Sequence, residues 1–307
     1  MRLAPIIPLI IIVSLLSTAF YFTYPLLEST LSPLNPRNIE NLPEATDIPT
    51  EIQFMPNIRF NHNNIAYRYE LGCESRKEKM YLAFETLQNL SSQISFYENN
   101  ENADMIISCS EENVEKSENI FLAGEGGPSK TFNLSINPLI TEGKINLYDR
   151  QNEIPCENPV VEIHEILHVF GYNHLANKST VLYPYYHCDQ QIPEEIISHL
   201  DNLYSQEPKS EIFFSELSAT KQGEYIDYNL EIKNEGLIPA EEVFLIIKAG
   251  NTEIDKTNFS TINPGNGKVY TVQNQKIPSK NIDKITFIVT TTSLEHSKEN
   301  NVQIVNF

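Results

Sequence analysis

The sequence predicts an α+β region followed by an all-β sandwich, with a transmembrane helix in front of both. Three observations predict this class. An apolar run covers residues 3–24, helical and strand periodicities alternate through residues 58–207, and short strands separated by turn residues fill residues 210–307. A length of 307 residues is consistent with two folded domains behind an N-terminal helix.

The apolar run at the start of the chain is long enough to cross a bilayer as a helix. Arg2 precedes it and Glu28 follows it, which favours an N-terminus inside and a body outside. We therefore predict a membrane anchor in residues 1–27, and a single-pass protein of the cell membrane with an extracellular body. Residues 17–19 (Ser-Thr-Ala) offer a cleavage site, so a signal peptide and a secreted protein are the alternative. Residues 28–57 carry five prolines and no apolar periodicity, as expected of an extended stalk.

The region from residue 58 to residue 207 mixes strand and helix signals. Strands are expected at residues 65–71, 94–96, 105–107 and 143–148, with a glycine-rich edge or loop at residues 122–128. A first helix should follow Ser75, whose hydroxyl would form a capping box with Glu78. A second helix should begin at Asn158 and Pro159, and a third should cover residues 193–204.

From residue 210 the pattern becomes all-β. Alternating apolar residues at 225–232, 243–247, 269–272 and 285–289 are separated by turn residues such as those at 234–236 and 263–265. About 95 residues with this pattern predict a β-sandwich of roughly seven strands.

Four cysteines, Cys73, Cys109, Cys156 and Cys188, are widely spaced and form no C-x-x-C pair. Two disulfides are their simplest use in an oxidising compartment, and four cysteines allow three pairings. We favour Cys73–Cys109 with Cys156–Cys188, because each pair lies within one half of its region. Four buried thiols are the alternative.

The residues that carry chemistry form the motif H-E-x-x-H-x-x-G-x-x-H. His164 and His168 are four residues apart, so both imidazoles leave one face of a helix and can share a tetrahedral ion. Gly171 suits a position past the helix end that needs positive φ, and the turn brings up His174 as a third ligand. Three imidazoles leave a fourth position for water, as in catalytic zinc sites, and Glu165 lies beside that position.

The long motif resembles that of the metzincin zinc proteases, and the segment after it resembles the Met-turn of their matrixin branch. Tyr183, Pro184 and Tyr186 match the Met-turn pattern, whereas Leu182 stands where the family has methionine. The resemblance covers about residues 58–206. It implies a zincin-like catalytic domain with a twisted mixed sheet and three helices.

By this resemblance the protein would be a zinc metalloendopeptidase that acts on a protein or peptide substrate. The residues it assigns are the ligands of one catalytic Zn²⁺ (His164, His168 and His174), the general base (Glu165), and the Met-turn and S1′ wall (Leu182, Tyr183, Pro184 and Tyr186). An extended substrate would lie along residues 122–124. The resemblance also allows a structural Ca²⁺ ion, which the sequence does not place.

The C-terminal segment resembles, more loosely, the CARDB-type sandwich domains of surface proteins. The resemblance rests on residues 234–236 (Asn-Glu-Gly), 264–265 (Pro-Gly) and 298–301 (Lys-Glu-Asn-Asn). It implies a spacer, or a module with a surface ligand.

Two other functions compete with the peptidase. The first is an inactive adhesion or binding protein that acts through the sandwich, favoured only by Leu182. The second is a zinc hydrolase of a non-protein polymer, which would share the same site. A nucleic-acid partner is not expected, because 41 acidic against 22 basic residues give a net charge of −19, which repels phosphate.

Overall fold

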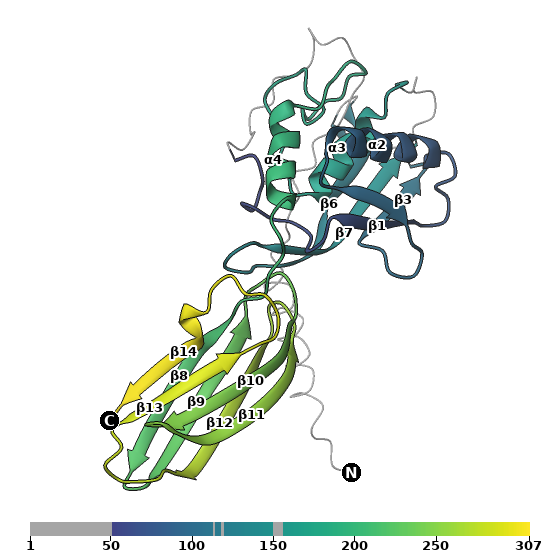
Figure 1. Cartoon of the computed structure of the whole chain (residues 1–307). Coiled ribbons are helices and arrows are strands. Elements are labelled where there is room, and N and C mark those ends of the chain that lie inside the picture. Colours follow the sequence, from purple (N-terminus) through teal and green to yellow (C-terminus); the bar gives the residue numbers. More distant parts are fainter. Residues whose placement is uncertain (1–50, 113, 118–119, 150–155) are drawn as a thin grey trace, which may run out of the picture. The chain divides into compact units, whose positions relative to one another are not determined.

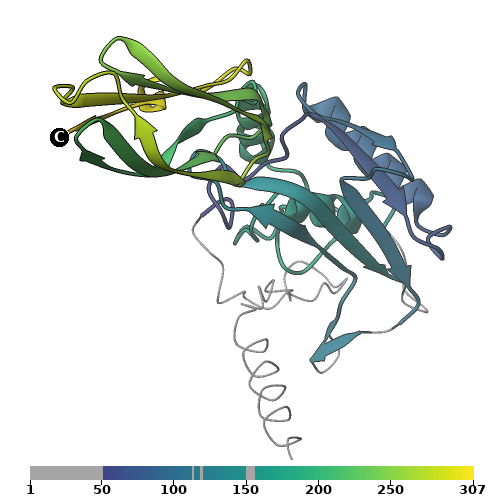
Figure 2. The same ribbon diagram turned by 90° about the horizontal axis from the view of Figure 1, so that it is seen from below.

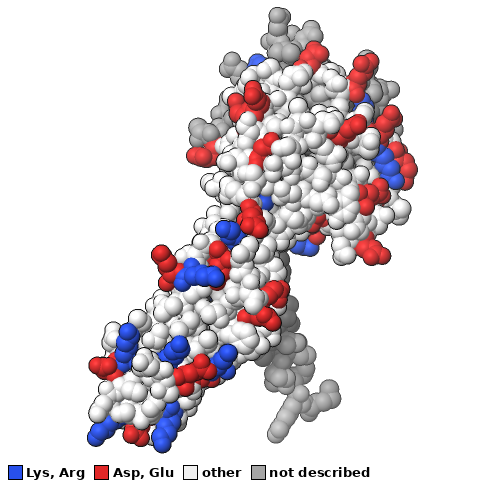
Figure 3. All heavy atoms as spheres, in the orientation of Figure 1, with Lys and Arg blue, Asp and Glu red and all other residues white. Residues whose placement is uncertain are grey.

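The computed structural model describes residues 51–112, 114–117, 120–149 and 156–307. Most of the buried apolar side chains form two clusters, one drawn from residues 58–204 and one from residues 212–289. These clusters follow the two expected regions, whose exact boundaries stay a prediction. On the face shown in Figure 3, acidic side chains predominate over the first region, whereas both signs of charge alternate over the second.

The first region contains a five-stranded sheet with the order β2-β1-β3-β7-β6. Its strands are β1 (Asn64–Tyr69), β2 (Ser95–Glu98), β3 (Met105–Ser110), β6 (Gly124–Phe132) and β7 (Leu139–Tyr148). All neighbours are parallel except β6 and β7, so β6 is an antiparallel strand at the edge of the sheet. A short hairpin, β4 (Glu115–Ser117) and β5 (Ile120–Phe121), precedes β6.

Three α-helices accompany this sheet: α2 (Lys77–Leu90), α3 (Val160–Val169) and α4 (Glu194–Tyr204). Figure 1 shows α2 and α3 side by side on the same face of the sheet. Nine of the ten residues of α3 are buried, because α2 and strands β6 and β7 all pack against it. A helix this deep in the core holds its polar side chains in fixed positions.

The start of α2 differs from the predicted capping box. Arg76 occupies the N-cap position, and no side chain caps the helix. The Ser75 hydroxyl instead donates a hydrogen bond to the Asp149 carboxylate, at 2.7 Å. A charged acceptor forms the stronger hydrogen bond, so the hydroxyl is not left for the backbone.

The second region is a two-sheet sandwich, as expected. One sheet has the order β11-β10-β13-β14 and the other β12-β9-β8. Their strands are β8 (Ile212–Gln222), β9 (Tyr225–Asn234), β10 (Ala240–Ala249), β11 (Thr252–Ile262), β12 (Gly267–Lys276), β13 (Lys284–Thr290) and β14 (Val302–Asn306). Apolar side chains from both sheets share one core, and the layers can be followed in Figure 2.

Both favoured disulfides are present, which confirms the predicted pairing. Cys73 is bonded to Cys109 and Cys156 to Cys188. The first joins the turn after β1 to β3. The second joins the segment before α3 to the segment between α3 and α4.

The predicted fold class is wrong. Strand residues make up 44% of the structure and helical residues 16%, so the described residues are mostly β and sandwich-like, without a helix-rich zincin domain. The prediction took its class from the mixed helix and strand signals of residues 58–207, whereas strands predominate in the described residues. The structure turns the glycine-rich edge or loop expected at residues 122–128 into the long strand β6, and it begins β7 at Leu139 instead of residue 143. Among the strands of the sandwich, the sequence pattern did not single out β8, β11 and β14.

The predicted transmembrane helix and single-pass membrane localisation are corrected as well. Within the described ranges, no helix has both the length and the apolar character needed to cross a membrane. The anchor in residues 1–27 and most of the stalk in residues 28–57 lie outside those ranges.

Candidate metal centre

Helix α3 brings the first two histidines of the motif to one face, and the turn after it brings the third. His164 is 2% exposed and His174 9% exposed. The turn between them depends on Gly171, whose φ is +86°, a conformation that favours glycine. A Cβ atom at Gly171 would also lie 2.3 Å from Ile58 Cγ2, so this position has no room for a side chain.

The three imidazoles converge on one point. The Nε2 atoms of His164 and His168 are 2.8 Å apart, those of His168 and His174 3.1 Å, and those of His174 and His164 3.3 Å. Two nitrogens bound tetrahedrally to zinc at its usual bond length would be about 3.4 Å apart. The triad therefore fits a zinc ion after a slight expansion.

The hydrogen bonds behind the rings fix which nitrogen carries the proton. His164 Nδ1 contacts the Val181 carbonyl oxygen, and His168 Nδ1 contacts the Tyr172 carbonyl oxygen at 2.7 Å. A carbonyl only accepts, so each Nδ1 carries the hydrogen and each Nε2 presents a lone pair. Lone pairs that face one another at about 3 Å repel, and a bound cation removes that repulsion.

Burial keeps the triad uncharged at neutral pH. Desolvation lowers the pKa of His168 to about 4 and that of His174 to about 3. Desolvation, followed by the neighbouring histidines, moves the pKa of His164 well below its usual value. Neutral imidazole is the form that binds a metal ion.

Glu165 lies next to this centre and directly against strand β6. Its side chain is 2% exposed, and desolvation raises the pKa of its carboxyl group. A Cβ atom at Gly124 would lie 2.6 Å from Glu165 Oε1, and one at Gly126 would lie 2.2 Å from the Glu165 backbone oxygen. The edge strand can approach the helix this closely only because both positions are glycine. The expected edge at residues 122–124 thus leads into β6.

The segment predicted to resemble a Met-turn lies beside the triad. Leu182 is fully buried, and its backbone oxygen accepts a hydrogen bond from the Leu175 amide at 2.8 Å, one residue past His174. Tyr183, Pro184 and Tyr186 are buried as well. The segment therefore supports the triad from both ends, through Val181 to His164 and through Leu182 to the chain after His174.

A pocket of about 310 Å³ adjoins the N-terminal end of α3. Ala123, Val161 and Tyr186 line one part of it, and Arg76 and Glu162 line another. It thus lies between the start of α2, the start of α3, the residue before β6 and the predicted S1′ wall, and neither the triad nor Glu165 lines it.

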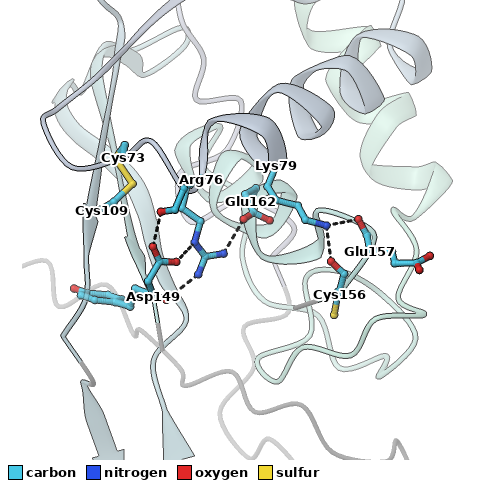
Figure 4. A network of polar contacts seen from close by, with 10 residues as sticks. Cys73, Arg76, Lys79, Cys109, Asp149, Cys156, Glu157 and Glu162 are labelled. Atoms are coloured by element: carbon cyan, nitrogen blue, oxygen red, sulfur yellow. Dashed lines mark hydrogen bonds and ion pairs between the residues drawn. A yellow bond between two sulfur atoms is a disulfide. The ribbon is translucent and has the colours of Figure 1, made fainter. Parts of the chain in front are cut away.

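Figure 4 shows a polar network, and several of its residues also line this pocket. Arg76 donates hydrogen bonds to the carboxylates of Asp149 and Glu162, the latter at 3.0 Å, and to the Tyr148 carbonyl oxygen at 2.9 Å. Lys79 donates to the carbonyl oxygens of residues 156 and 157, just before α3. The start of α2 therefore clamps the end of β7 to the start of α3.

Sequence reasoning missed this network, although it left a signal. Arg76, Lys77 and Lys79 stand at the beginning of α2, where the helix dipole disfavours cations. Basic residues at such a position indicate that acidic partners or carbonyl oxygens lie nearby.

Comparisons with known proteins give little for this chain. No family model matches it, and no curated protein matches it. A solved CARDB domain from Pyrococcus furiosus, crystallised in complex with di-metal ions, is a distant structural likeness. It is 17% identical, covers 32% of this chain and 86% of its own, and has a TM-score of 0.27.

Proposed function

We propose that this chain is a zinc-dependent endopeptidase in which Glu165 is the general base. The observation that carries the proposal is the convergence of three neutral imidazole nitrogens within 3.3 Å of one another, with a buried carboxylate on the same helix. The resemblance of the motif and of Leu182–Tyr186 to matrixin sequences supports the same function. Leu182 fills the methionine position with a side chain of similar volume, a swap that usually costs less than about 1.5 kcal/mol.

The chemistry divides between the bound ion and the protein. A zinc ion held by the three imidazoles would supply a Lewis acid and a bound water of lowered pKa. Glu165 would take the proton from the attacking water and pass it to the amide nitrogen that leaves. The carbonyl groups of Val181 and Tyr172 would keep the imidazoles in the tautomer that presents Nε2.

Strand β6 is the natural place for the substrate backbone. Among the described residues β6 pairs only with β7, so its other edge carries backbone groups that an extended peptide can bind. The glycines at 124 and 126 bring this edge against Glu165. The pocket beside Val161 and Tyr186 would then receive one substrate side chain.

The test uses the full chain loaded with one equivalent of zinc and an unfolded protein as substrate. We expect cleavage by the wild type, and a rate lower by about 10²–10⁴-fold in Glu165→Gln with zinc content unchanged. Glu85→Gln, the same change on the exposed face of α2, is the matched control and should cleave like the wild type.

Two outcomes would contradict the proposal. A wild type that binds zinc but cleaves no unfolded protein would favour a binding protein or a hydrolase of another polymer. Full activity in Glu165→Gln would exclude Glu165 as the base, even if the chain is a peptidase.

A further inference from the structure

A second polar cluster lies in the sandwich, where two chain segments far apart in sequence meet. Glu211 immediately precedes β8, whereas Glu295, Asn300 and Asn301 lie between β13 and β14. A bridge between Ser210 and Glu295 holds the two segments together. We call these four residues, Glu211, Glu295, Asn300 and Asn301, the glutamate cluster.

In the described residues, the glutamate cluster holds one buried and one partly buried carboxylate without an ion pair to either. The buried one is Glu211, which is 6% exposed. Burial raises the pKa of Glu295 and the charge of Glu211 raises it further, whereas hydrogen bonds from Asn301 and Ile212 and the positive charge of Lys298 lower it. Buried carboxylates are normally paired with a cation or bound to a metal ion.

The two asparagines lie against these carboxylates. Asn300 Nδ2 donates to Glu211 Oε1 at 2.6 Å, and Asn301 Nδ2 lies 3.1 Å and 3.0 Å from the two carboxylate oxygens of Glu295. Two backbone amides complete the contacts, from Ser297 to Glu211 at 2.9 Å and from Ile212 to Glu295 at 3.5 Å.

The amide oxygens of both asparagines are buried without any hydrogen-bond partner. In the described residues only four buried side-chain nitrogen or oxygen atoms lack one, and two of them are Asn300 Oδ1 and Asn301 Oδ1. Asn301 is 5% exposed. A half-turn of an amide exchanges oxygen and nitrogen without changing its shape. After that turn each oxygen would face its carboxylate, which is unfavourable alone and favourable around a cation.

We propose that the glutamate cluster binds a calcium ion. With both amides turned, every side-chain atom that faces the ion would be an oxygen, as hard cations prefer, and two carboxylates would balance the charge of one divalent ion. Calcium accepts six to eight oxygens in flexible geometry, whereas magnesium requires a near-ideal octahedron and releases its waters reluctantly. The bound ion would tie the segment before β14 to the start of β8.

The proposal does not depend on the peptidase, because it is tested by binding and unfolding. Calcium chloride is titrated into the zinc-loaded full chain in calcium-free buffer and followed by calorimetry. We expect one site with a dissociation constant between about 10⁻⁵ and 10⁻³ M, at least about tenfold weaker binding of magnesium, and a higher Tm with calcium.

Variants connect the binding to these residues. Glu211→Gln should weaken calcium binding at least about tenfold, and Asn300→Ala, at a half-exposed position that tolerates change, should do so to a similar degree. Glu216→Gln, an exposed glutamate on β8, is the matched control and should bind like the wild type. A wild type with no binding heat and no change in Tm up to about 10 mM calcium would overturn the proposal, as would equal binding by Asn300→Ala.

Discussion

The two polar clusters of this chain differ in the charge of their side chains and in the backbone elements that carry them. The histidine triad gathers neutral nitrogens on a buried helix and the turn after it, and the nitrogens lie 2.8–3.3 Å apart. The glutamate cluster gathers charged oxygens on two loop segments, and amide groups hold each carboxylate. A helix positions its side chains through its own backbone, whereas the loops depend on the hydrogen bonds of the cluster itself. The histidine triad should therefore keep its shape when one of its ligands is removed.

The largest effect should follow from removing one imidazole. His168→Ala leaves two zinc ligands on an intact core, so we expect zinc affinity to fall by on the order of a thousandfold or more with little loss of fold. Competition with a chelator of known affinity measures this. Calcium binding should stay unchanged, and a parallel loss of calcium binding would show that the two clusters are not independent.

The helix that carries the triad depends on its clamp. Arg76→Met would leave Glu162, 3% exposed, as a buried charge without its partner, which costs about 3 kcal/mol of unfolding free energy. Urea unfolding measures the loss. The double variant Arg76→Met/Glu162→Leu should recover part of it, and no recovery would mean that Arg76 acts mainly through Asp149 and Tyr148.

Substitutions of two glycines of β6 should distinguish an effect on stability from an effect on the site. Gly126→Ala places a methyl group against the Glu165 backbone, so we expect a loss of about 1–3 kcal/mol in unfolding free energy. In Gly124→Ala the new methyl group meets only the Glu165 side chain, which can move. We therefore expect the rate of substrate cleavage to fall, with little change in the free energy of unfolding. Equal losses of stability in both variants would argue against this close approach of β6 to α3.

The smallest effect should come from His62, a histidine outside the triad. His62 lies 3.2 Å from Asp104, and this hydrogen bond raises the pKa of His62, whereas burial lowers the pKa of His168. A pKa that is higher in the folded state stabilises the fold fully at pH values below the pKa of the unfolded state, near 6.5. This stabilisation is lost as the pH rises through the pKa of the folded state. His62→Gln should therefore cost more at pH 5.5 than at pH 8.5, by under about 1 kcal/mol because His62 is half-exposed. Urea unfolding of both proteins at the two pH values measures this. A loss that is equal at both pH values, or larger at pH 8.5, would contradict a raised pKa of His62.

Much of the triad could be predicted from the sequence, because local geometry determines it. Residues four apart on a helix share a face, and Gly171 marks the turn toward His174. The disulfide pairing followed from the nearness of the cysteines along the chain. The glutamate cluster could not be predicted in this way, because 84 residues separate Glu211 from Glu295 and only the strand order brings them together.

The extent of the strands and the start of α2 were harder to predict than the histidine triad. Apolar alternation did not mark β6 as a strand, because Gly124, Gly126 and Gly127 carry no side chain to alternate. The capping box failed because Asp149, 74 residues away in sequence, competes for the Ser75 hydroxyl. In both cases a distant packing partner outweighs the local pattern.

The closeness of Gly124 and Gly126 to Glu165 has a consequence for selectivity. Where β6 carries glycine, at residues 124, 126 and 127, it offers a bound chain its peptide groups and no side chain. The proposed enzyme would thus recognise its substrates mainly by their backbone, and the pocket beside Val161 would take up one side chain. A substrate of such a site would need several residues of accessible, extended chain. Folded proteins would be spared by their own secondary structure, and damaged or unfolded ones would be cut with little regard to their sequence.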